Sequence, residues 1–135
     1  MRIEVKAIDH LVLRTTKMPQ MLTFYCQVLG CSIERETSPE TGLTQLRAGN
    51  ALIDLVSVES ELGRLGGGAA TQTENNLDHF CLQIKNMPEE EISRHLLSFG
   101  VIVEPFARRY GAQGFSHSIY IKDPEGNTVE LKNQI

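Results

Sequence analysis

The sequence predicts an α+β fold built from two copies of one βαβββ module. Two observations carry this prediction: strand-like and helix-like segments follow the same order in both halves of the chain, and short motifs recur at matching places. Each half begins with a β-type run that contains Asp-His, continues with Met-Pro, and then shows a helical pattern ending in Gly. The β-type runs that open the halves are Ile8–Leu13 and Leu77–Leu82.

The elements of the first half follow from the spacing of its apolar residues. Residues 7–14 alternate as in a strand. From Met18 to Leu29 the apolar positions recur with helical period, Pro19 suits a first helical turn, and Gly30 suits the position after the helix. Three strands are expected next, at residues 31–36, 44–48 and 51–57.

The second half predicts a strand at 77–84, a helix at about 88–98 and strands near 101–106, 116–122 and 127–132. Residues 110–114 are expected to form a loop. Between the halves, the glycine-rich segment Gly63–Asn76 is expected to be a flexible connector, because consecutive glycines are unfavourable inside an element. Residues 1–135 are therefore expected to form one domain, with module 1 at about 7–58 and module 2 at about 76–133.

Composition excludes several classes of protein. The chain has 135 residues, 41% hydrophobic and 22% charged, with a net charge of −4, so we expect a globular protein that does not bind nucleic acid. Its apolar runs are too short to cross a bilayer, and residues 2–6 carry charges where a signal peptide needs apolar residues; we expect a cytoplasmic protein. Three cysteines without metal-type spacing are expected to be free thiols: Cys26, Cys31 and Cys81.

Strand alternation separates polar from apolar side chains in both halves. The apolar residues of each strand are expected to pack under the helix of their module, and His10 and His79 then project from the other face with one acidic residue each, Asp54 and Glu130. Two imidazoles and two carboxylates suit a divalent transition metal with open positions for water or substrate. A lone histidine on a strand is usually structural, but here the same pair of residue types recurs in both halves.

The sequence resembles the vicinal oxygen chelate superfamily, which includes glyoxalase I, fosfomycin-resistance thiol transferases and extradiol dioxygenases. The resemblance covers nearly the whole chain outside the glycine-rich segment, and its most specific part is the closing segment. The segments that carry it are Ile8–Arg14, Phe24–Gly30, Leu77–Phe80 and Asp123–Leu131.

The resemblance implies curved mixed sheets around a metal cup, with His10, His79 and Glu130 as metal ligands. Asp54 stands where glyoxalases have a fourth ligand, a Glu; whether the shorter Asp ligates directly or through water stays open. Arg14 matches an Arg that faces the carboxylate of the thiol cofactor in glyoxalases. The sequence departs from the pattern at Val58, where those enzymes have Asn, and this puts the use of glutathione in doubt.

The leading hypothesis is a metal-dependent lyase or isomerase of glyoxalase type, in which Glu130 and Asp54 move a proton while the metal stabilises an enediolate. The alternatives are a thiol transferase like the fosfomycin-resistance proteins and a binding protein without turnover. The metal is expected to be Ni, Co, Zn, Mn or Fe, with a thiol such as glutathione as a candidate co-substrate. We expect a small-molecule substrate and a homodimer, with module pairing within or across chains left open. The expected substrate contacts are Arg14, Arg109 and His117.

Overall fold

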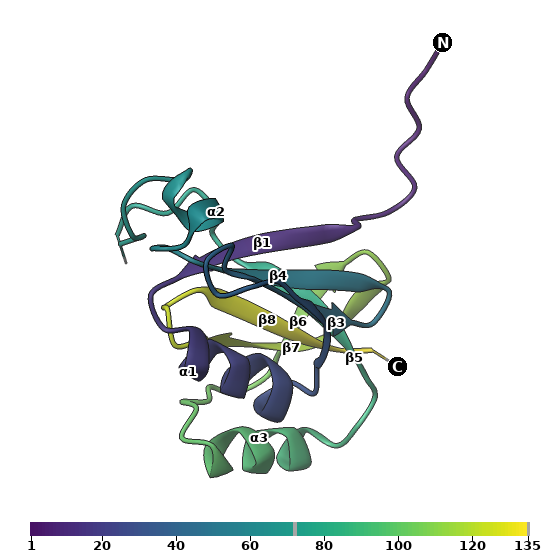
Figure 1. The fold of residues 1–135 in the computed structure, drawn as a ribbon. Coiled ribbons are helices and arrows are strands. Elements are labelled where there is room, and N and C mark those ends of the chain that lie inside the picture. The colour runs from purple at the N-terminus through teal and green to yellow at the C-terminus, as the bar shows by residue number, and fades with distance from the viewer. Residues whose placement is uncertain (72, 135) are drawn as a thin grey trace. The chain divides into compact units, whose positions relative to one another are not determined.

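The computed structural model describes residues 1–71 and 73–134. Gln72, in the predicted connector, and Ile135, at the end of the predicted domain, lie outside the described residues. The chain divides into two compact units, Met1–Ala70 and a second that begins at Thr71 (Figure 1). We call them module 1 and module 2 and describe each by itself. No helix among the described residues has the length and apolar character needed to span a membrane.

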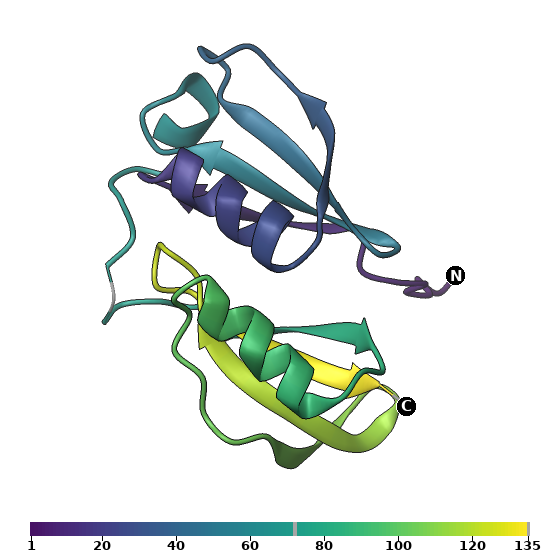
Figure 2. The ribbon, with the colours of Figure 1, turned by 90° about the horizontal axis from the view of Figure 1, so that it is seen from below.

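Module 1 is a four-stranded mixed sheet with a helical segment on one face (Figure 2). The strand order is β1-β4-β3-β2; β1 and β4 are parallel and the other neighbours are antiparallel. Its elements are β1 (His10–Thr15), α1 (Met18–Leu22), η1 (Thr23–Val28), β2 (Ser32–Glu36), β3 (Leu43–Ala48), β4 (Ala51–Ser57) and α2 (Glu61–Arg64).

The helix predicted over Met18–Leu29 is confirmed in position, but its second half is π-helical. The backbone N–H of Leu29 donates to the carbonyl of Phe24, five residues earlier, at 3.0 Å. Gly30 adopts a φ of 79°, the left-handed conformation expected after a helix. The apolar stripe is buried in the module, as its spacing indicates: Met21, Phe24, Tyr25 and Val28.

Module 2 repeats this architecture with the strand order β5-β8-β7-β6 and a parallel β5–β8 pair. Figure 2 shows α3 across one face of its sheet, as α1 and η1 lie across theirs. The elements are β5 (Phe80–Lys85), α3 (Glu89–Ser98), β6 (Ala107–Gly111), β7 (Gly114–Lys122) and β8 (Thr128–Gln134). The two βαβββ modules predicted from the sequence are confirmed.

The strand predicted near 101–106 is wrong, and the loop predicted at 110–114 is confirmed only at its centre, the turn at residues 112–113. Residues 107–111 form β6, which joins β7 through a tight turn that ends at Gly114, with a φ of 88°. That turn sets the antiparallel register, in which Arg109 pairs with Ser116. The preceding apolar run reads as a strand, but Ile102 is 85% exposed and Pro105 has no N–H to donate to a neighbouring strand.

The repeat extends to the pairing of individual residues. In module 1, Val12 stands two residues after His10 and pairs with Asp54 on the parallel neighbour. In module 2, Cys81 stands two residues after His79 and pairs with Glu130. Asp54 and Glu130 therefore occupy equivalent positions, each on the strand next to the one that the histidine begins or precedes.

The beginning of the predicted flexible connector is folded. Ser60 caps the short helix α2: its Oγ accepts from the N–H of Gly63 at 3.0 Å and donates to the carbonyl of Ser57 at 2.7 Å. The glycine at 63 is required by space, because a Cβ there would lie 1.8 Å from the carbonyl oxygen of Ser57. Sequence reasoning missed α2 because a four-residue helix has no apolar periodicity.

Candidate functional site

His10 begins β1 and is held by the residue before it. Its Nδ1 lies 2.7 Å from Oδ1 of Asp9, so the ring donates its Nδ1 proton to that carboxylate. The Asp9 hydrogen bond is the main cause that raises the pKa of His10 above its usual value, and the charge of Asp54 adds to it. The hydrogen bond fixes the ring's tautomer and leaves Nε2 as the nitrogen that can ligate a metal.

Asp54 is a buried carboxylate on β4, only 4% exposed. Its Oδ2 accepts a hydrogen bond from Nε2 of Gln45 on the neighbouring strand β3, at 3.1 Å. Its Oδ1 is buried and has no hydrogen-bond partner among the described residues. A buried carboxylate oxygen without a donor is unfavourable unless a ligand satisfies it, and a cation at Oδ1 would do so.

In module 2 the histidine and the carboxylate are in contact. Nε2 of His79 lies 3.2 Å from Oε1 of Glu130, a buried residue of β8. Nδ1 of the same ring lies 2.6 Å from Oδ2 of Asp78. The ring of Tyr120, which pairs with Glu130 on β7, packs edge-on against the imidazole with centroids 5.2 Å apart. Asp78 therefore leaves Nε2 of His79 facing the second predicted ligand.

Sequence reasoning did not assign a role to Asp9 or Asp78, although both stand in the motifs that carry the repeat. The signal was the Asp-His pair that occurs in each half. A carboxylate that accepts the second ring proton of a histidine is the usual partner of metal-ligating imidazoles, because it orients the ring and raises its basicity. Both modules have this arrangement.

The donor set fits a divalent metal ion. In the part of the chain that the structure describes, no three His, Cys, Asp or Glu side chains are placed to hold a metal ion together. Each module by itself supplies one oriented imidazole and one buried carboxylate. Nitrogen and oxygen donors in this ratio suit Zn²⁺, Ni²⁺, Co²⁺, Mn²⁺ or Fe²⁺, and the unsatisfied Oδ1 of Asp54 is the observation that most favours a cation.

The structure places Arg14 against the glycine-rich segment. Its guanidinium donates to the carbonyl of Gly63 from Nε at 3.2 Å and from Nη2 at 2.9 Å, to that of Gly68 from Nη1 at 2.9 Å, and to that of Gly67. Gly66 leaves room for the guanidinium, since a Cβ there would lie 2.5 Å from Nε of the arginine. An anion could reach Arg14 only in competition with these carbonyls.

The other two predicted substrate contacts lie on opposite faces of the module 2 sheet. Arg109 shares the face of Glu130: its Nη1 donates to the carbonyl oxygen of Ser118 at 2.7 Å, and its guanidinium covers the ring of Tyr120 at 4.4 Å. His117 lies on the helix side, with Nδ1 2.9 Å from Oε2 of Glu89 on α3. The structure brings Arg109 to the face of the predicted ligand Glu130 and does not bring His117 there.

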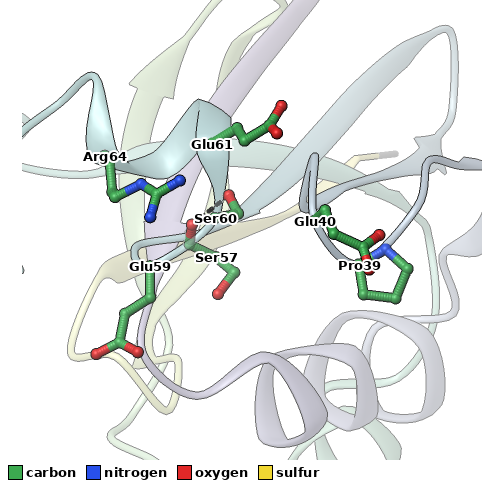
Figure 3. A pocket seen from close by; sticks show the side chains of 7 residues that line it. All are labelled: Pro39, Glu40, Ser57, Glu59, Ser60, Glu61 and Arg64. Atoms are coloured by element: carbon green, nitrogen blue, oxygen red, sulfur yellow. Dashed lines mark hydrogen bonds between the residues drawn. The ribbon is translucent and has the colours of Figure 1, made fainter.

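Module 1 also contains a hollow of about 400 Å³ beside α2 (Figure 3). None of its lining residues is a predicted site residue. Its one hydroxyl at the start of the helix, that of Ser60, already bonds within the protein. The side chains that line it are Pro39, Glu40, Ser57, Glu59, Ser60, Glu61 and Arg64.

The sequence and the fold match known proteins. A family model for the "Glyoxalase/Bleomycin resistance protein/Dioxygenase superfamily" matches residues 7–131. The virulence protein STM3117 of Salmonella typhimurium is 32% identical over 132 residues, which are 97% of this chain and 86% of that protein. Its crystal structure covers 98% of this chain and 100% of its own, with a TM-score of 0.73 and 27% identity.

Two proteins of lower identity show the same fold. Lactoylglutathione lyase from Agrobacterium tumefaciens has a TM-score of 0.67 at 23% identity, over 95% of this chain and 93% of its own. The fosfomycin resistance protein FosX from Listeria monocytogenes has a TM-score of 0.71 at 16% identity, over 98% of this chain and 94% of its own.

Proposed function

Because the chain belongs to the glyoxalase/bleomycin resistance protein/dioxygenase superfamily, we propose that it is a metal-dependent lyase or isomerase of glyoxalase type. Its substrate would be a small molecule with oxygen atoms on adjacent carbons. The observation that carries the proposal is the repeated pair of an Asp-oriented histidine and a buried carboxylate. We further propose that the protein is a cytoplasmic homodimer, as superfamily members are often dimers.

The metal ligands in this proposal are His10, Asp54, His79 and Glu130. The two histidines would ligate through Nε2, since Asp9 and Asp78 occupy their other ring nitrogens. The unsatisfied buried Oδ1 supports Asp54 as a direct ligand rather than one that acts through water. Gln45 would keep the carboxylate oriented by its bond to Oδ2.

The chemistry needs a proton moved between adjacent carbons. A divalent metal would supply a Lewis acid that polarises a substrate carbonyl and makes the neighbouring C–H more acidic. We assign the proton transfer to Glu130. Its Oε1 contacts His79, and its Oε2 has no partner among the described residues. With Nε2 of His79 and Oε1 of Glu130 both turned toward the metal, Oε2 would accept the proton and return it to the next carbon.

A second candidate reaction is the transfer of a thiol or another nucleophile to an electrophile. The observation that favours transfer of a nucleophile other than glutathione concerns Arg14. Its guanidinium is engaged by three glycine carbonyls, and the residue expected to help bind the thiol cofactor is replaced by Val58. Both departures weaken the case for glutathione and leave the metal ligands untouched.

The direct experiment is an assay of the metal-loaded protein against α-ketoaldehyde–thiol adducts and small epoxides. We expect isomerisation of an adduct, with deuterium from D₂O incorporated at the carbon that receives the proton. Glu130→Gln should lower kcat by about a hundredfold or more, because the proton acceptor is lost. Glu104→Gln, an exposed matched control, should leave it unchanged. Turnover of epoxides alone would favour the second candidate, and turnover of neither class would contradict both.

A further inference from the structure

Lys132 is a buried cation that the proposed function does not use. It stands two residues after Glu130 on β8, so strand alternation puts both side chains on the same face of the sheet. The residue is only 2% exposed, and its Nζ donates to the carbonyl oxygens of Arg109 and Ser116, the latter at 3.3 Å. Within residues 1–71 and 73–134 it forms no ion pair.

The position of the ammonium group is set by the sheet beneath it. Lys132 pairs with Ser118 on β7, and its aliphatic stem continues to the edge strand β6. There a Cβ at Gly111 would lie 3.0 Å from Cε and 3.2 Å from Cδ of the lysine. The glycine thus leaves room for the stem, and Nζ is held over the backbone of β6 and β7 rather than in solvent.

A second polar group at the same place has no partner. Ser116 is 7% exposed, and its Oγ makes no hydrogen bond in the described part of the chain. Its own carbonyl accepts from Nζ of Lys132, and strand alternation puts its side chain on the face of Ser118, the residue that pairs with Lys132. A buried hydroxyl without a partner is rare, and it is unfavourable unless a ligand supplies the missing bond.

The surrounding charges favour an anion. Arg109 lies on the same face, and Nη1 is its only nitrogen with a hydrogen bond among the described residues. Glu130 is the acidic residue of this face, and it contacts His79. When a buried ammonium contacts only neutral carbonyls, no opposite charge offsets the free-energy cost of its desolvation.

We propose that Lys132 and Ser116, with Arg109 beside them, bind a compact oxyanion group of the substrate, a carboxylate or a phosphonate or phosphate. Nζ has a third donor free, and the Ser116 hydroxyl supplies another. The backbones of Lys132 and Glu130 lie two strand residues apart, about 7 Å along β8, and Nζ reaches from there across to β6. The substrate is therefore an acid whose anionic group is held apart from the carbons that react at Glu130. Its relation to Glu130 rests on the proposed function, whereas the oxyanion site itself does not.

Isothermal titration of the full chain with inorganic phosphate tests this site, with acetate as the carboxylate arm. Each anion is titrated into metal-loaded protein and into protein treated with a chelator. The variants are Lys132→Met, which keeps the stem, and Ser116→Ala. Lys6→Met is the matched control, because it removes the same charge from an exposed residue.

We expect saturable binding of at least one anion to the wild type with and without metal. Lys132→Met should weaken it at least about tenfold and Ser116→Ala severalfold, with Lys6→Met unchanged. Lys132→Met should unfold at the same temperature as the wild type or a higher one, since a buried charge is replaced by an apolar chain. If that variant does not fold, Ser116→Ala decides alone.

Equal affinity in Lys132→Met and the wild type would overturn the proposal, as would equal affinity in Ser116→Ala when that variant decides alone. No saturable binding of either anion up to about 50 mM would also overturn it. Binding that disappears with the chelator would place the anion on the metal, which overturns the Lys132 site and leaves the proposed function standing. A wild-type protein that binds the anion but binds no metal ion would overturn the proposed function alone.

Discussion

His79 immediately precedes β5, and Glu130 lies on the neighbouring parallel strand β8, with Nε2 of the imidazole 3.2 Å from Oε1 of the carboxylate. Asp78 holds the opposite ring nitrogen at 2.6 Å, which makes a chain of carboxylate, imidazole and carboxylate. Module 1 has the same first pair in Asp9 and His10, at 2.7 Å. The two modules thus present their histidines in the same way, and this orientation can be tested apart from the ligands themselves.

Replacing the orienting carboxylates should weaken metal binding without abolishing it. Asp78→Asn and Asp9→Asn should each lower the affinity for Zn²⁺ or Ni²⁺ by about 10- to 100-fold, because the ring loses its orientation and part of its basicity. A competition titration with a chromophoric chelator measures this. Glu104→Gln should change nothing, and wild-type affinity in both Asp variants would contradict the assigned role.

The same substitution at position 9 should change the titration of His10 in the metal-free protein. Asp9 stabilises the charged imidazolium and so raises its pKa, and Asp9→Asn should lower the pKa toward the ordinary value. By linkage, the stabilisation that the pair gives the metal-free fold is present below the ordinary pKa and is lost as pH rises through the raised one. An NMR titration of the ring protons reads the shift directly, and an unchanged pKa would show that Asp9 does not hold the ring.

The packing of Arg14 against the glycine-rich segment predicts different effects of alanine substitution at Gly66 and at Gly68. Gly66→Ala would put a Cβ 2.5 Å from Nε of Arg14, whereas a Cβ at Gly68 meets nothing within 4 Å. Gly66→Ala and Arg14→Lys should each lower the free energy of unfolding by about 1–3 kcal/mol, since donor bonds to the carbonyls are lost or displaced. Proteolysis and urea unfolding measure the effect. Gly68→Ala serves as the control, and equal stability of all the variants would contradict the packing of Arg14 against this segment.

His117 should not act on substrate, because its partner is Glu89 on the helix side of the sheet. Both side chains are substantially exposed, at 51% and 40%, so His117→Ala should cost less than about 1 kcal/mol of stability. It should also leave kcat/KM within about twofold of the wild type, whatever the substrate. Glu89→Gln should behave alike, and a loss of tenfold or more in kcat/KM for His117→Ala alone would restore the sequence-based expectation.

The thiol of Cys31, which is free as the sequence predicts, should react slowly because it is partly buried. Burial raises its pKa to about 11, so at pH 8 roughly one molecule in a thousand carries the reactive thiolate. Labelling by iodoacetamide, followed by mass spectrometry, should accelerate about tenfold per pH unit up to pH 10. The urea-unfolded protein gives the unhindered rate, and equal rates for folded and unfolded protein at pH 8 would contradict the shift.

The repeat was predictable because several motifs occur in the same order in both modules: the Asp-His pair, the Met-Pro pair and the helical apolar stripe before a glycine. Alternation was also enough to separate Asp54 and Glu130 from their apolar neighbours. It failed around Ile102, where an apolar run is exposed. The strand there is replaced by β6, which is fixed by its turn and register with β7 and not by its own composition.

The site was only partly visible in the sequence. Alternation places Lys132 on the face of Glu130, yet a lysine near a chain end usually reads as a surface residue, and its burial depends on Gly111 two strands away. The engagement of Arg14 depends on carbonyls more than forty residues distant in sequence. Long-range contacts of this kind leave no local pattern, so the sequence assigned Arg14 to a ligand.

The most direct test of the account is the metal content of the protein purified without chelators, measured together with calorimetric titration of Zn²⁺ or Ni²⁺ into the metal-free protein. The account predicts one metal ion per pair of modules. It also predicts a loss of affinity of at least about a hundredfold in Glu130→Gln and in His10→Ala, because each removes a ligand. A wild-type protein that holds no stoichiometric metal and gains none on titration would contradict the account, as would unchanged affinity in both variants.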